Sequence, residues 1–152
     1  MAGITPTSRT LEYIREHGWL AAKVEIWNPY AGQHGQRRDM FGFADIVALG
    51  EGRIIAIQSC GEAFSAHHHK LTEDEYAAPN AMRWLECGGR LILIGWRKVL
   101  VKRGGKAMRW APRIREYTLD DFRELRDKTP GQIFIPTDPL CSVEDSEDGQ
   151  EA

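Results

Sequence analysis

The stretch that decides the fold is residues 37–49, RRDMFGFADIVAL, followed after GEG at 50–52 by residues 53–60, RIIAIQSC. Both runs are apolar enough to form buried strands, and the short glycine-rich link predicts a hairpin. Each run carries one polar residue within its apolar pattern, Asp45 in the first and Gln58 in the second. On adjacent antiparallel strands these two side chains can converge, and a buried carboxylate beside a second oxygen suits a hard divalent cation.

The segments on either side of this hairpin predict an α/β domain. In chain order we expect a helix at about 8–17 capped by Ser8 or Thr7, a strand at 19–27, a loop at 28–36, strands at 42–49 and 53–60, a loop or short helix at 61–71, a helix start at Thr72, a helix at 79–86, strands at 90–96 and 114–118, and a helix at 119–128. Gly18 stands where a left-handed residue commonly ends a helix. The order helix, three strands, helix, strand predicts a central mixed sheet with helices on both faces.

Length and composition indicate one domain without a membrane segment. The chain has 152 residues, and its three cysteines show no CxxC spacing. We find neither the run of about 20 apolar residues that spans a bilayer nor the features of a signal peptide. These features predict no membrane partner, no disulfide framework, no zinc knuckle and a cytoplasmic location. We expect a single domain at 1–137, with its core at about 8–98 and a basic extension at 97–137.

Charge is distributed unevenly along the chain. Residues 138–152 hold six of the 22 acidic residues and no Lys or Arg, which leaves 20 basic against 16 acidic residues in 1–137. We expect the acidic tail at 138–152 to be disordered. Residues 97–115 hold eight basic residues and no acidic one. This stretch fits a solvated loop or hairpin, and it also fits a contact with a nucleic-acid backbone.

Several short motifs, taken in order, resemble a known nuclease family. The motifs are RDMFGFADI at 38–46, AIQ at 56–58, GGR at 88–90 and GWRK at 95–98. With the helix-β-β-β-α-β order they resemble the PD-(D/E)XK nuclease superfamily. Within it they are most similar to small phage and prophage proteins related to archaeal-type Holliday-junction resolvases and VRR-NUC-like nucleases. The resemblance covers about residues 8–98 and implies a restriction-endonuclease-like core.

The resemblance also implies roles for the residues that match the family motif. Asp45 matches the first Asp and would bind Mg²⁺ or Mn²⁺. Gln58 stands where the family has Asp or Glu, and the Ser59 carbonyl is a further expected metal ligand. Cys60 stands at the position of the catalytic Lys, whose charge a thiol cannot supply. As a hypothesis beyond the resemblance, we expect compensation for the missing carboxylate from Asp39, Glu25 or Glu12, and for the missing cation from Arg38 or Lys70.

The reaction that the resemblance implies is metal-dependent hydrolysis of DNA, either duplex or branched. By analogy with junction resolvases we expect a phage-encoded homodimer acting in a bacterial host cell. The basic residues expected to contact DNA are Arg37, Arg38, Arg97, Lys98, Lys102 and Arg103. The alternative function is a catalytically inactive nuclease fold that binds DNA or protein, since Gln58 and Cys60 both depart from the family pattern.

Each candidate residue also has an ordinary structural interpretation. Asp45 could be a satisfied buried acid or a strand-end cap, and Gln58 could be a hydrogen-bonded core amide. Glu25 could lie on the solvent face of an alternating strand. Asp39 could pair with the arginines at 37–38.

The histidine run at 67–69 invites a zinc interpretation that helix geometry opposes. Adjacent residues on a helix point about 100° apart and cannot converge on one ion. A contribution to nucleic-acid contact at the surface is the preferred interpretation. Trp96 and Trp110 have a better claim to base stacking than the other tryptophans, because basic residues surround them. The tryptophans interpreted as core or hinge residues are Trp19, Trp27 and Trp84.

Overall fold

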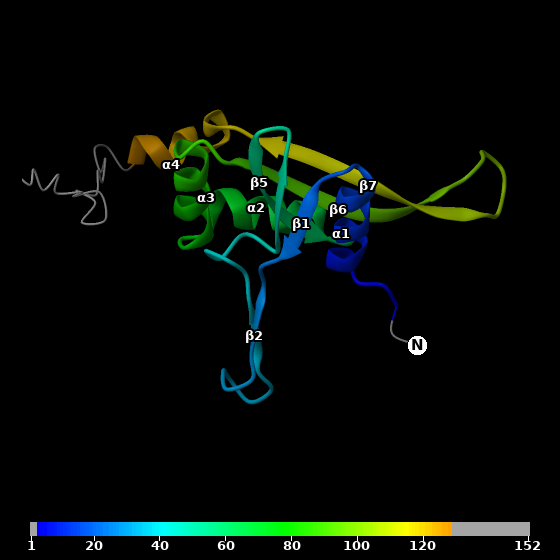
Figure 1. Cartoon of the computed structure of the whole chain (residues 1–152), viewed down its shortest axis with the longest axis horizontal. Helices are drawn as coiled ribbons and strands as arrows, with labels where there is room; N and C mark the ends of the chain where they lie inside the picture. Colours follow the sequence, from blue (N-terminus) through cyan, green and yellow to red (C-terminus); the bar gives the residue numbers. More distant parts are fainter. Residues whose placement is uncertain (1–2, 129–152) are drawn as a thin grey trace, which may run out of the picture.

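The computed structural model describes residues 3–128, which contain four α-helices, one short 3-10 helix and seven strands (Figure 1). The helices are α1 (Pro6–Glu16), α2 (Phe64–Glu73), α3 (Ala77–Glu86), η1 (Leu119–Phe122) and α4 (Arg123–Lys128). The strands are β1 (Leu20–Lys23), β2 (Ile26–Asn28), β3 (Gln36–Arg38), β4 (Ile46–Gly50), β5 (Arg53–Cys60), β6 (Arg90–Leu100) and β7 (Met108–Tyr117). The predicted acidic tail at 138–152 lies outside the described residues, as does the end of the predicted domain.

A five-stranded mixed sheet in the order β1-β4-β5-β6-β7 forms the centre of the protein. β4 is antiparallel to both of its neighbours, β5 and β6 are parallel, and β7 is antiparallel to β6. The parallel pair needs a crossover connection, which contains α2 and α3. The prediction of an α/β fold with a central mixed sheet is therefore confirmed, and so is the predicted hairpin of the two central strands.

Helices cover both faces of this sheet, and the core is divided accordingly. On one face, Leu11 and Ile14 of α1 pack with the cluster of Ile57 on β5. On the other face, Leu71 of α2 belongs to the same cluster as Leu93 of β6. Successive strand residues point to opposite faces, so the two central strands β5 and β6 each contribute to both clusters. The sequence prediction of helices on both sides of the sheet is confirmed.

The predicted strand at 19–27 is divided into two strands that belong to different sheets. β1 pairs with β4 in the main sheet, whereas β2 pairs with β3 in a two-stranded sheet. Residues 26–38, which we call the arm, project away from the body (Figure 1). The loop predicted at 28–36 is the tip of this arm. The division falls at Val24 and Glu25, which lie outside both strands.

The first central strand begins at Ile46 rather than at residue 42, because the chain turns sharply just before it. Gly42 has a φ of 78° and donates its N–H to the carbonyl of Asp39 at 3.0 Å. Such a φ is readily adopted by glycine. Met40 and Ala44 then pair through an antiparallel bridge across the turn. Asp39 and Asp45 are the next residues outward on either side of this bridge. The turn therefore places these two acids side by side.

The start of α1 differs from the sequence prediction. Its N-cap is Thr5, whose side chain accepts a hydrogen bond from the N–H of Ser8 at 3.2 Å. The predicted caps, Thr7 and Ser8, lie inside the helix because Pro6, with its fixed φ, begins the first turn. Gly18 follows the helix with a φ of 84°, as predicted.

The boundaries of α2 and α3 also differ from the prediction. The ambiguous segment at 61–71 lies largely in α2. Thr72, predicted as a helix start, lies in the last turn of α2 and donates its hydroxyl to the carbonyl of His68 at 3.0 Å. The acceptor for the start of α3 is Asp74, whose carboxylate accepts backbone N–H groups at 3.0 and 2.8 Å. The short polar side chain that accepts these N–H groups is therefore two residues after Thr72, and the helix itself begins at Ala77.

The basic stretch at 97–115 forms a hairpin, which is one of the two forms that the sequence predicted. β6 and β7 extend well beyond the predicted strands and pair continuously from Leu91 with Tyr117 to Leu100 with Met108. The hairpin extends away from the helices, in a different direction from the arm (Figure 1). Within residues 3–128, we find no helix with the length and apolarity needed to cross a membrane.

Candidate metal centre

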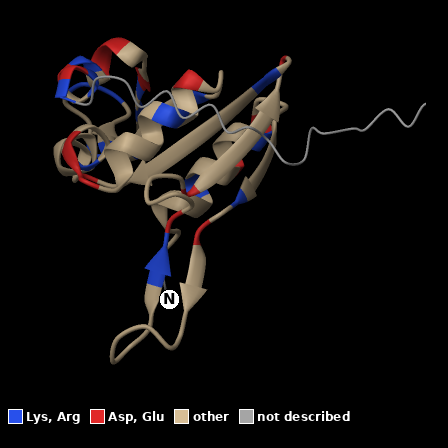
Figure 2. Cartoon of the chain, turned by 90° about the vertical axis from the view of Figure 1, so that its left-hand side faces the viewer, with Lys and Arg blue, Asp and Glu red and all other residues tan. Residues whose placement is uncertain are grey.

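Three carboxylates converge where the arm joins the main sheet. Glu25, Asp39 and Asp45, which we call the carboxylate cluster, each offer one oxygen within 4.8 Å of the others. Glu25 directly precedes β2 and Asp39 directly follows β3, so Figure 2 shows acidic residues (red) at both feet of the arm. Oxygen ligands on opposite sides of a hard divalent cation lie about 4 to 5 Å apart. The cluster could therefore hold a metal ion.

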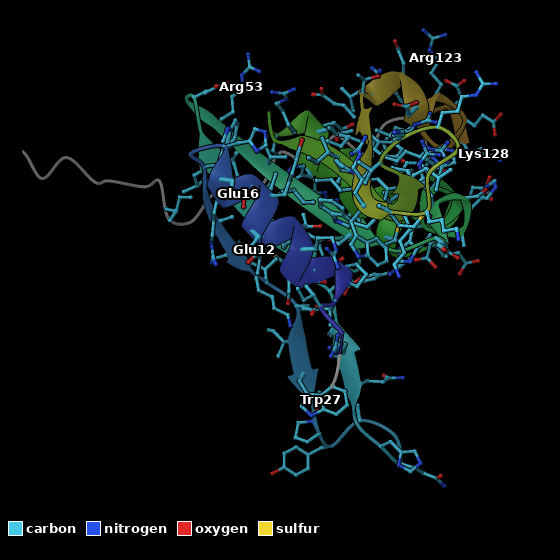
Figure 3. The ribbon with its side chains drawn as sticks, turned by 90° about the vertical axis from the view of Figure 1, so that its right-hand side faces the viewer. Glu12, Glu16, Trp27, Arg53, Arg123 and Lys128 are labelled. Atoms are coloured by element: carbon cyan, nitrogen blue, oxygen red, sulfur yellow. The ribbon has the colours of Figure 1, made fainter. Side chains whose placement is uncertain are left out.

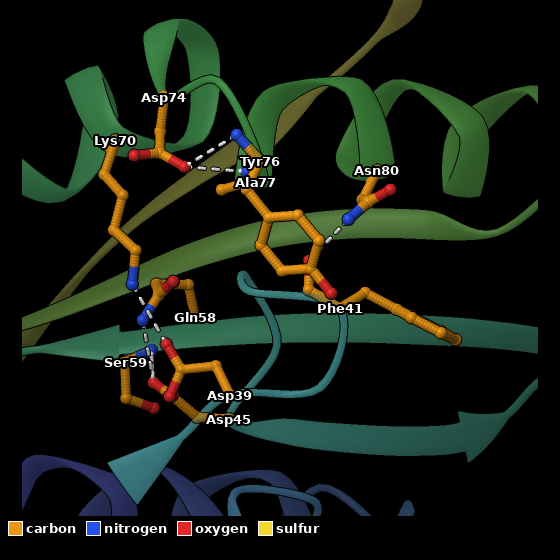
Figure 4. Close-up of polar contacts among 10 residues, drawn as sticks. All are labelled: Asp39, Phe41, Asp45, Gln58, Ser59, Lys70, Asp74, Tyr76, Ala77 and Asn80. Atoms are coloured by element: carbon orange, nitrogen blue, oxygen red, sulfur yellow. Dashed lines mark hydrogen bonds and ion pairs between the residues drawn. The ribbon is translucent and has the colours of Figure 1, made fainter. Parts of the chain in front are cut away.

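The carboxylate of Asp45 is oriented by two hydrogen bonds from β5. Its Oδ2 accepts the backbone N–H of Ser59 at 2.8 Å and the Nε2 of Gln58 at 3.0 Å (Figure 4). Both bonds end on Oδ2, and neither engages Oδ1. The predicted convergence of Asp45 and Gln58 is confirmed. Ser59 makes its contact through the N–H, whereas we predicted its carbonyl as a metal ligand.

Gln58 is satisfied on one side only. The side chain is 2 % exposed, and within residues 3–128 its Oε1 has no hydrogen-bond partner. A half-turn of the amide would exchange oxygen and nitrogen, placing an oxygen about 3 Å from Asp45, the spacing of adjacent ligands on an octahedral Mg²⁺. A buried acceptor without a partner costs about 1 to 3 kcal/mol. Gln58 is therefore a hydrogen-bonded buried amide, as the alternative interpretation expects, but only through its Nε2.

Three cationic side chains surround the cluster. Lys70 reaches down from α2 and places its Nζ 3.0 Å from Oδ2 of Asp39 (Figure 4). The Nζ of Lys23 and the guanidinium of Arg37 lie 2.7 and 3.7 Å from Oε1 of Glu25. These contacts are ion pairs whose geometry is not that of a directed hydrogen bond. Sequence analysis predicted Lys70 as a compensating cation but did not predict Lys23.

Burial raises the pKa of Asp45 to about 8, and the negative charge of Asp39 is the next largest cause. The hydrogen bond from the N–H of Ser59 opposes this shift, and the charge of Glu25 adds to it. The Asp45 carboxyl therefore holds a proton at neutral pH when no cation is present. A divalent cation would displace this proton, because metal ligation requires the ionised form.

Cys60, at the position of the family's catalytic Lys, is a buried packing residue. Its sulfur lies beside Gly95, where an added Cβ would sit 3.3 Å from the Sγ atom. Burial raises the pKa of the thiol to about 11, with the charge of Asp45 as the second cause. The group is a neutral thiol near pH 7. It supplies neither a cation nor a thiolate nucleophile to the cluster.

Of the acids expected to compensate for the missing carboxylate, two lie in the carboxylate cluster and Glu12 does not. The side chain of Glu25 is 8 % exposed and faces the cluster, so its interpretation as a solvent-face residue is wrong. Glu12 is exposed on α1 and is not a member of the cluster (Figure 3). Because α1 covers the opposite face of the sheet from α2, Glu12 does not compensate for a missing ligand.

A second buried polar group lies on the α1 side of β5. The Oγ1 of Thr10 accepts hydrogen bonds from Ser59 Oγ at 3.0 Å and from Trp96 Nε1 at 2.9 Å, and it donates to the carbonyl of Pro6 at 2.9 Å. We call Thr10, Ser59 and Trp96 the Thr10 network. Trp96 is 5 % exposed, so its predicted base stacking is wrong. No local pattern identifies this network, since its members are distant in sequence.

The residues predicted to contact DNA lie on two separate hairpins. Arg37 and Arg38 lie on β3 of the arm, whereas the others lie on β6 or in the turn that follows it: Arg97, Lys98, Lys102 and Arg103. Neighbouring residues on a strand point to opposite faces. Arg37 and Arg38 therefore cannot hold the same phosphate, and the same holds for Arg97 and Lys98.

The histidines of α2 diverge, as the helix geometry predicts. The Nδ1 of His68 lies 2.7 Å from the hydroxyl of Tyr117, and the Nδ1 of His69 lies 3.1 Å from Glu73. His67 has a buried Nδ1 without a partner among the described residues. The three rings have different surroundings and do not form one metal site.

Comparisons of the chain with protein-family models, with curated proteins and with solved structures give no match. The function is therefore argued from the geometry of the carboxylate cluster.

Proposed function

We propose that the protein is a metal-dependent nuclease with a PD-(D/E)XK-like core that hydrolyses phosphodiester bonds in DNA. The observation that carries this proposal is the convergence of three carboxylates and one lysine, Lys70, beside the buried amide of Gln58, whose Oε1 lacks a hydrogen bond from the described residues. The chain order supports it: α1, then β1, β4 and β5 of one sheet, then α2 and α3, then β6. This is the helix-β-β-β-α-β order that the sequence resemblance implies.

The proposed metal is Mg²⁺ or Mn²⁺, held by the carboxylate cluster and the Gln58 amide. All of these donors are oxygens, which suit hard cations rather than zinc. When bound, such a cation supplies Lewis-acid chemistry that polarises a phosphate and acidifies water. Oε1 of Gln58 lacks a hydrogen bond from residues 3–128 and is available to ligate it, whereas Oε1 of Glu25 would exchange its ion pairs with Lys23 and Arg37 for the cation.

Lys70 is proposed to take the role of the family's catalytic lysine. Its ammonium lies 3.0 Å from Asp39, in the cluster, although it comes from α2 and not from β5. A positive charge at this place would stabilise the negative charge that develops on a phosphate during hydrolysis. The neutral thiol of Cys60 leaves that role open. The departures from the family pattern at 58 and 60 are therefore compatible with an active site assembled from other positions.

The proposal is tested by cleavage of plasmid and branched DNA with Mn²⁺. Asp45→Asn keeps the shape of the side chain and removes its charge. We expect cleavage to fall by at least about 100-fold, because a cation contributes several kcal/mol to such reactions. The matched control is Glu12→Gln, an exposed acid on α1, which should keep full activity.

The same assay separates the alternative function. DNA binding without cleavage, in the wild-type protein and in Asp45→Asn alike, would support an inactive nuclease fold that acts as a binding module. Cleavage that survives Asp45→Asn would contradict the proposed site. Branched DNA as the preferred substrate, a homodimer and a phage origin remain predictions from the resemblance.

A further inference from the structure

We infer that the hollow at the base of the arm binds one unstacked nucleotide of a DNA strand, with Trp27 as the stacking surface and Arg37 as the phosphate contact. This inference rests on the proposed function for the identity of the ligand as a DNA substrate. It adds a substrate class, because a base can stack on a protein ring only when it leaves the duplex stack. The preferred ligand is therefore single-stranded or locally unpaired DNA.

The hollow has a volume of about 340 Å³ and is lined by Lys23, Glu25, Trp27 and Arg37. Trp27 and Arg37 are direct partners across β2 and β3, so their side chains lie on the same face of the arm. Glu25 belongs both to this hollow and to the carboxylate cluster. A nucleotide in the hollow would therefore have its phosphate beside the proposed metal site.

Trp27 is held in place by the opposite strand while much of its ring stays accessible. The side chain is 55 % exposed (Figure 3), which corrects its interpretation as a core or hinge residue. A Cβ added to Gly35 would lie 2.4 Å from the ring, so the ring lies directly against the backbone there. A fixed aromatic ring with a free side costs little entropy when a base stacks on it.

The composition of the arm indicates an anionic and aromatic partner. Residues 26–38 contain Arg37 and Arg38 but no acidic residue, and Tyr30 near the tip is 94 % exposed. A two-stranded hairpin is only marginally stable in water by itself. Cations together with accessible aromatic rings match the phosphates and bases of a nucleic-acid strand. An apolar protein partner would offer no anionic group to either arginine.

The test measures binding of a fluorescein-labelled oligothymidine and of a blunt duplex by anisotropy in EDTA, where cleavage cannot occur. We expect Trp27→Leu to weaken oligothymidine binding about tenfold or more, the usual loss for one stacked base, and to weaken duplex binding much less. Gly35→Ala should cause a similar loss, because the added methyl group displaces the ring. The conservative control Trp27→Phe should keep most of the affinity.

Tryptophan fluorescence gives a readout that a purely structural role would not change. Unlabelled oligothymidine should quench the emission of the wild-type protein, and Trp27→Phe should lose most of that quenching while still binding. The inference is overturned if Trp27→Leu binds oligothymidine as tightly as the wild type, if Trp27→Phe loses as much affinity as Trp27→Leu, or if quenching persists in Trp27→Phe.

The outcomes distinguish this inference from the proposed function. Cleavage that depends on Asp45, with oligothymidine binding unchanged in Trp27→Leu, would keep the nuclease and remove the subsite. Quenching and binding that depend on Trp27, without any cleavage, would keep the subsite and remove the nuclease.

Discussion

Two buried polar groups lie on opposite sides of β5, and they differ in whether the protein satisfies them. On the α1 side, the hydroxyl of Thr10 has three partners at 2.9 to 3.0 Å. On the α2 side, no described residue donates a hydrogen bond to the buried Oε1 of Gln58, and the buried Oε1 of Glu25 has only ion pairs, with Lys23 and Arg37. Ser59 joins the two groups, because its Oγ bonds to Thr10 and its N–H bonds to Asp45.

This difference separates a structural network from a binding site. Burying a polar group is costly unless its hydrogen bonds are made, so the Thr10 network contributes to stability as it stands. The carboxylate cluster gathers like charges and raises the pKa of Asp45, which destabilises the ionised protein. An arrangement that costs stability without a cation is typical of a functional site.

The largest expected effect is the pH dependence that the carboxylate cluster gives to the free energy of unfolding. The pKa of Asp45 is about 8 in the folded protein, above its ordinary value of 3.8. The contribution of protonated Asp45 to the free energy of unfolding is therefore fully present below about pH 4, and it is lost as pH rises through 8. Without metal, the free energy of unfolding should fall by about 1 kcal/mol per pH unit across this window.

Denaturant unfolding of the wild type and of Asp45→Asn, at several pH values in EDTA, measures this effect. The difference between the two proteins isolates Asp45 from His67 and His68, whose pKa values are lowered by burial. Asp45→Asn should lose the decline between pH 4 and 8. Parallel profiles for both proteins would contradict the raised pKa.

A divalent cation should stabilise the protein through the cluster and not through the Thr10 network. Binding to the folded state alone adds about 3 kcal/mol when the free cation is at 100 times its dissociation constant. Thermal melting with increasing Mn²⁺ should show this shift for the wild type and no shift for Asp45→Asn. The affinity should also increase with pH up to about 8, where Asp45 loses its proton.

Breaking the Thr10 network should lower stability and leave cation binding in place. Thr10→Val keeps the shape of the side chain but removes the acceptor for Ser59 and Trp96. We expect a loss of about 2 kcal/mol in the free energy of unfolding, because two buried donors lose their partner. The melting shift caused by Mn²⁺ should stay close to that of the wild type. A lost shift would mean that the two groups are not independent.

Gln58→Glu should strengthen cation binding at the carboxylate cluster by adding a further carboxylate, without affecting the Thr10 network. The change supplies the acid that the family has at this position, so we expect Mn²⁺ to bind about tenfold more tightly. In EDTA the variant should be less stable than the wild type, because a further negative charge is buried. Isothermal titration gives the affinity, and Gln58→Leu, which offers no oxygen, should bind more weakly than the wild type.

The smallest effect is expected far from the cluster, in the turn of the β6–β7 hairpin. Lys102 and Arg103 are exposed there, and Lys102→Ala would remove at most one phosphate contact. We expect DNA affinity to weaken slightly and the slope of log affinity against log salt to fall by about 1. Anisotropy titrations at several salt concentrations measure this slope. An unchanged slope would mean that the turn does not contact the backbone.

Local sequence patterns were sufficient for the central hairpin and for its polar pair. The apolar runs and the glycines at 50–52 predicted two adjacent antiparallel strands, and on such strands Asp45 and Gln58 were expected to converge. The same patterns were less useful at 19–27, where one run of residues contributes to two sheets. Periodicity describes a strand but not its partner, so the pattern predicts a loop at 28–36 and does not indicate that β2 and β3 pair with each other.

The sequence by itself determined the α/β class, the sheet with helices on both faces, and the convergence of Asp45, directly before β4, with Gln58 on β5, because these follow from periodicity and short-range turns. Only the tertiary structure decided that Glu25 and Asp39 join Asp45, and that Lys70 reaches them from α2. It also decided that Trp96 is buried and Trp27 exposed. Burial and convergence depend on contacts between residues distant in the chain, which a local pattern does not encode.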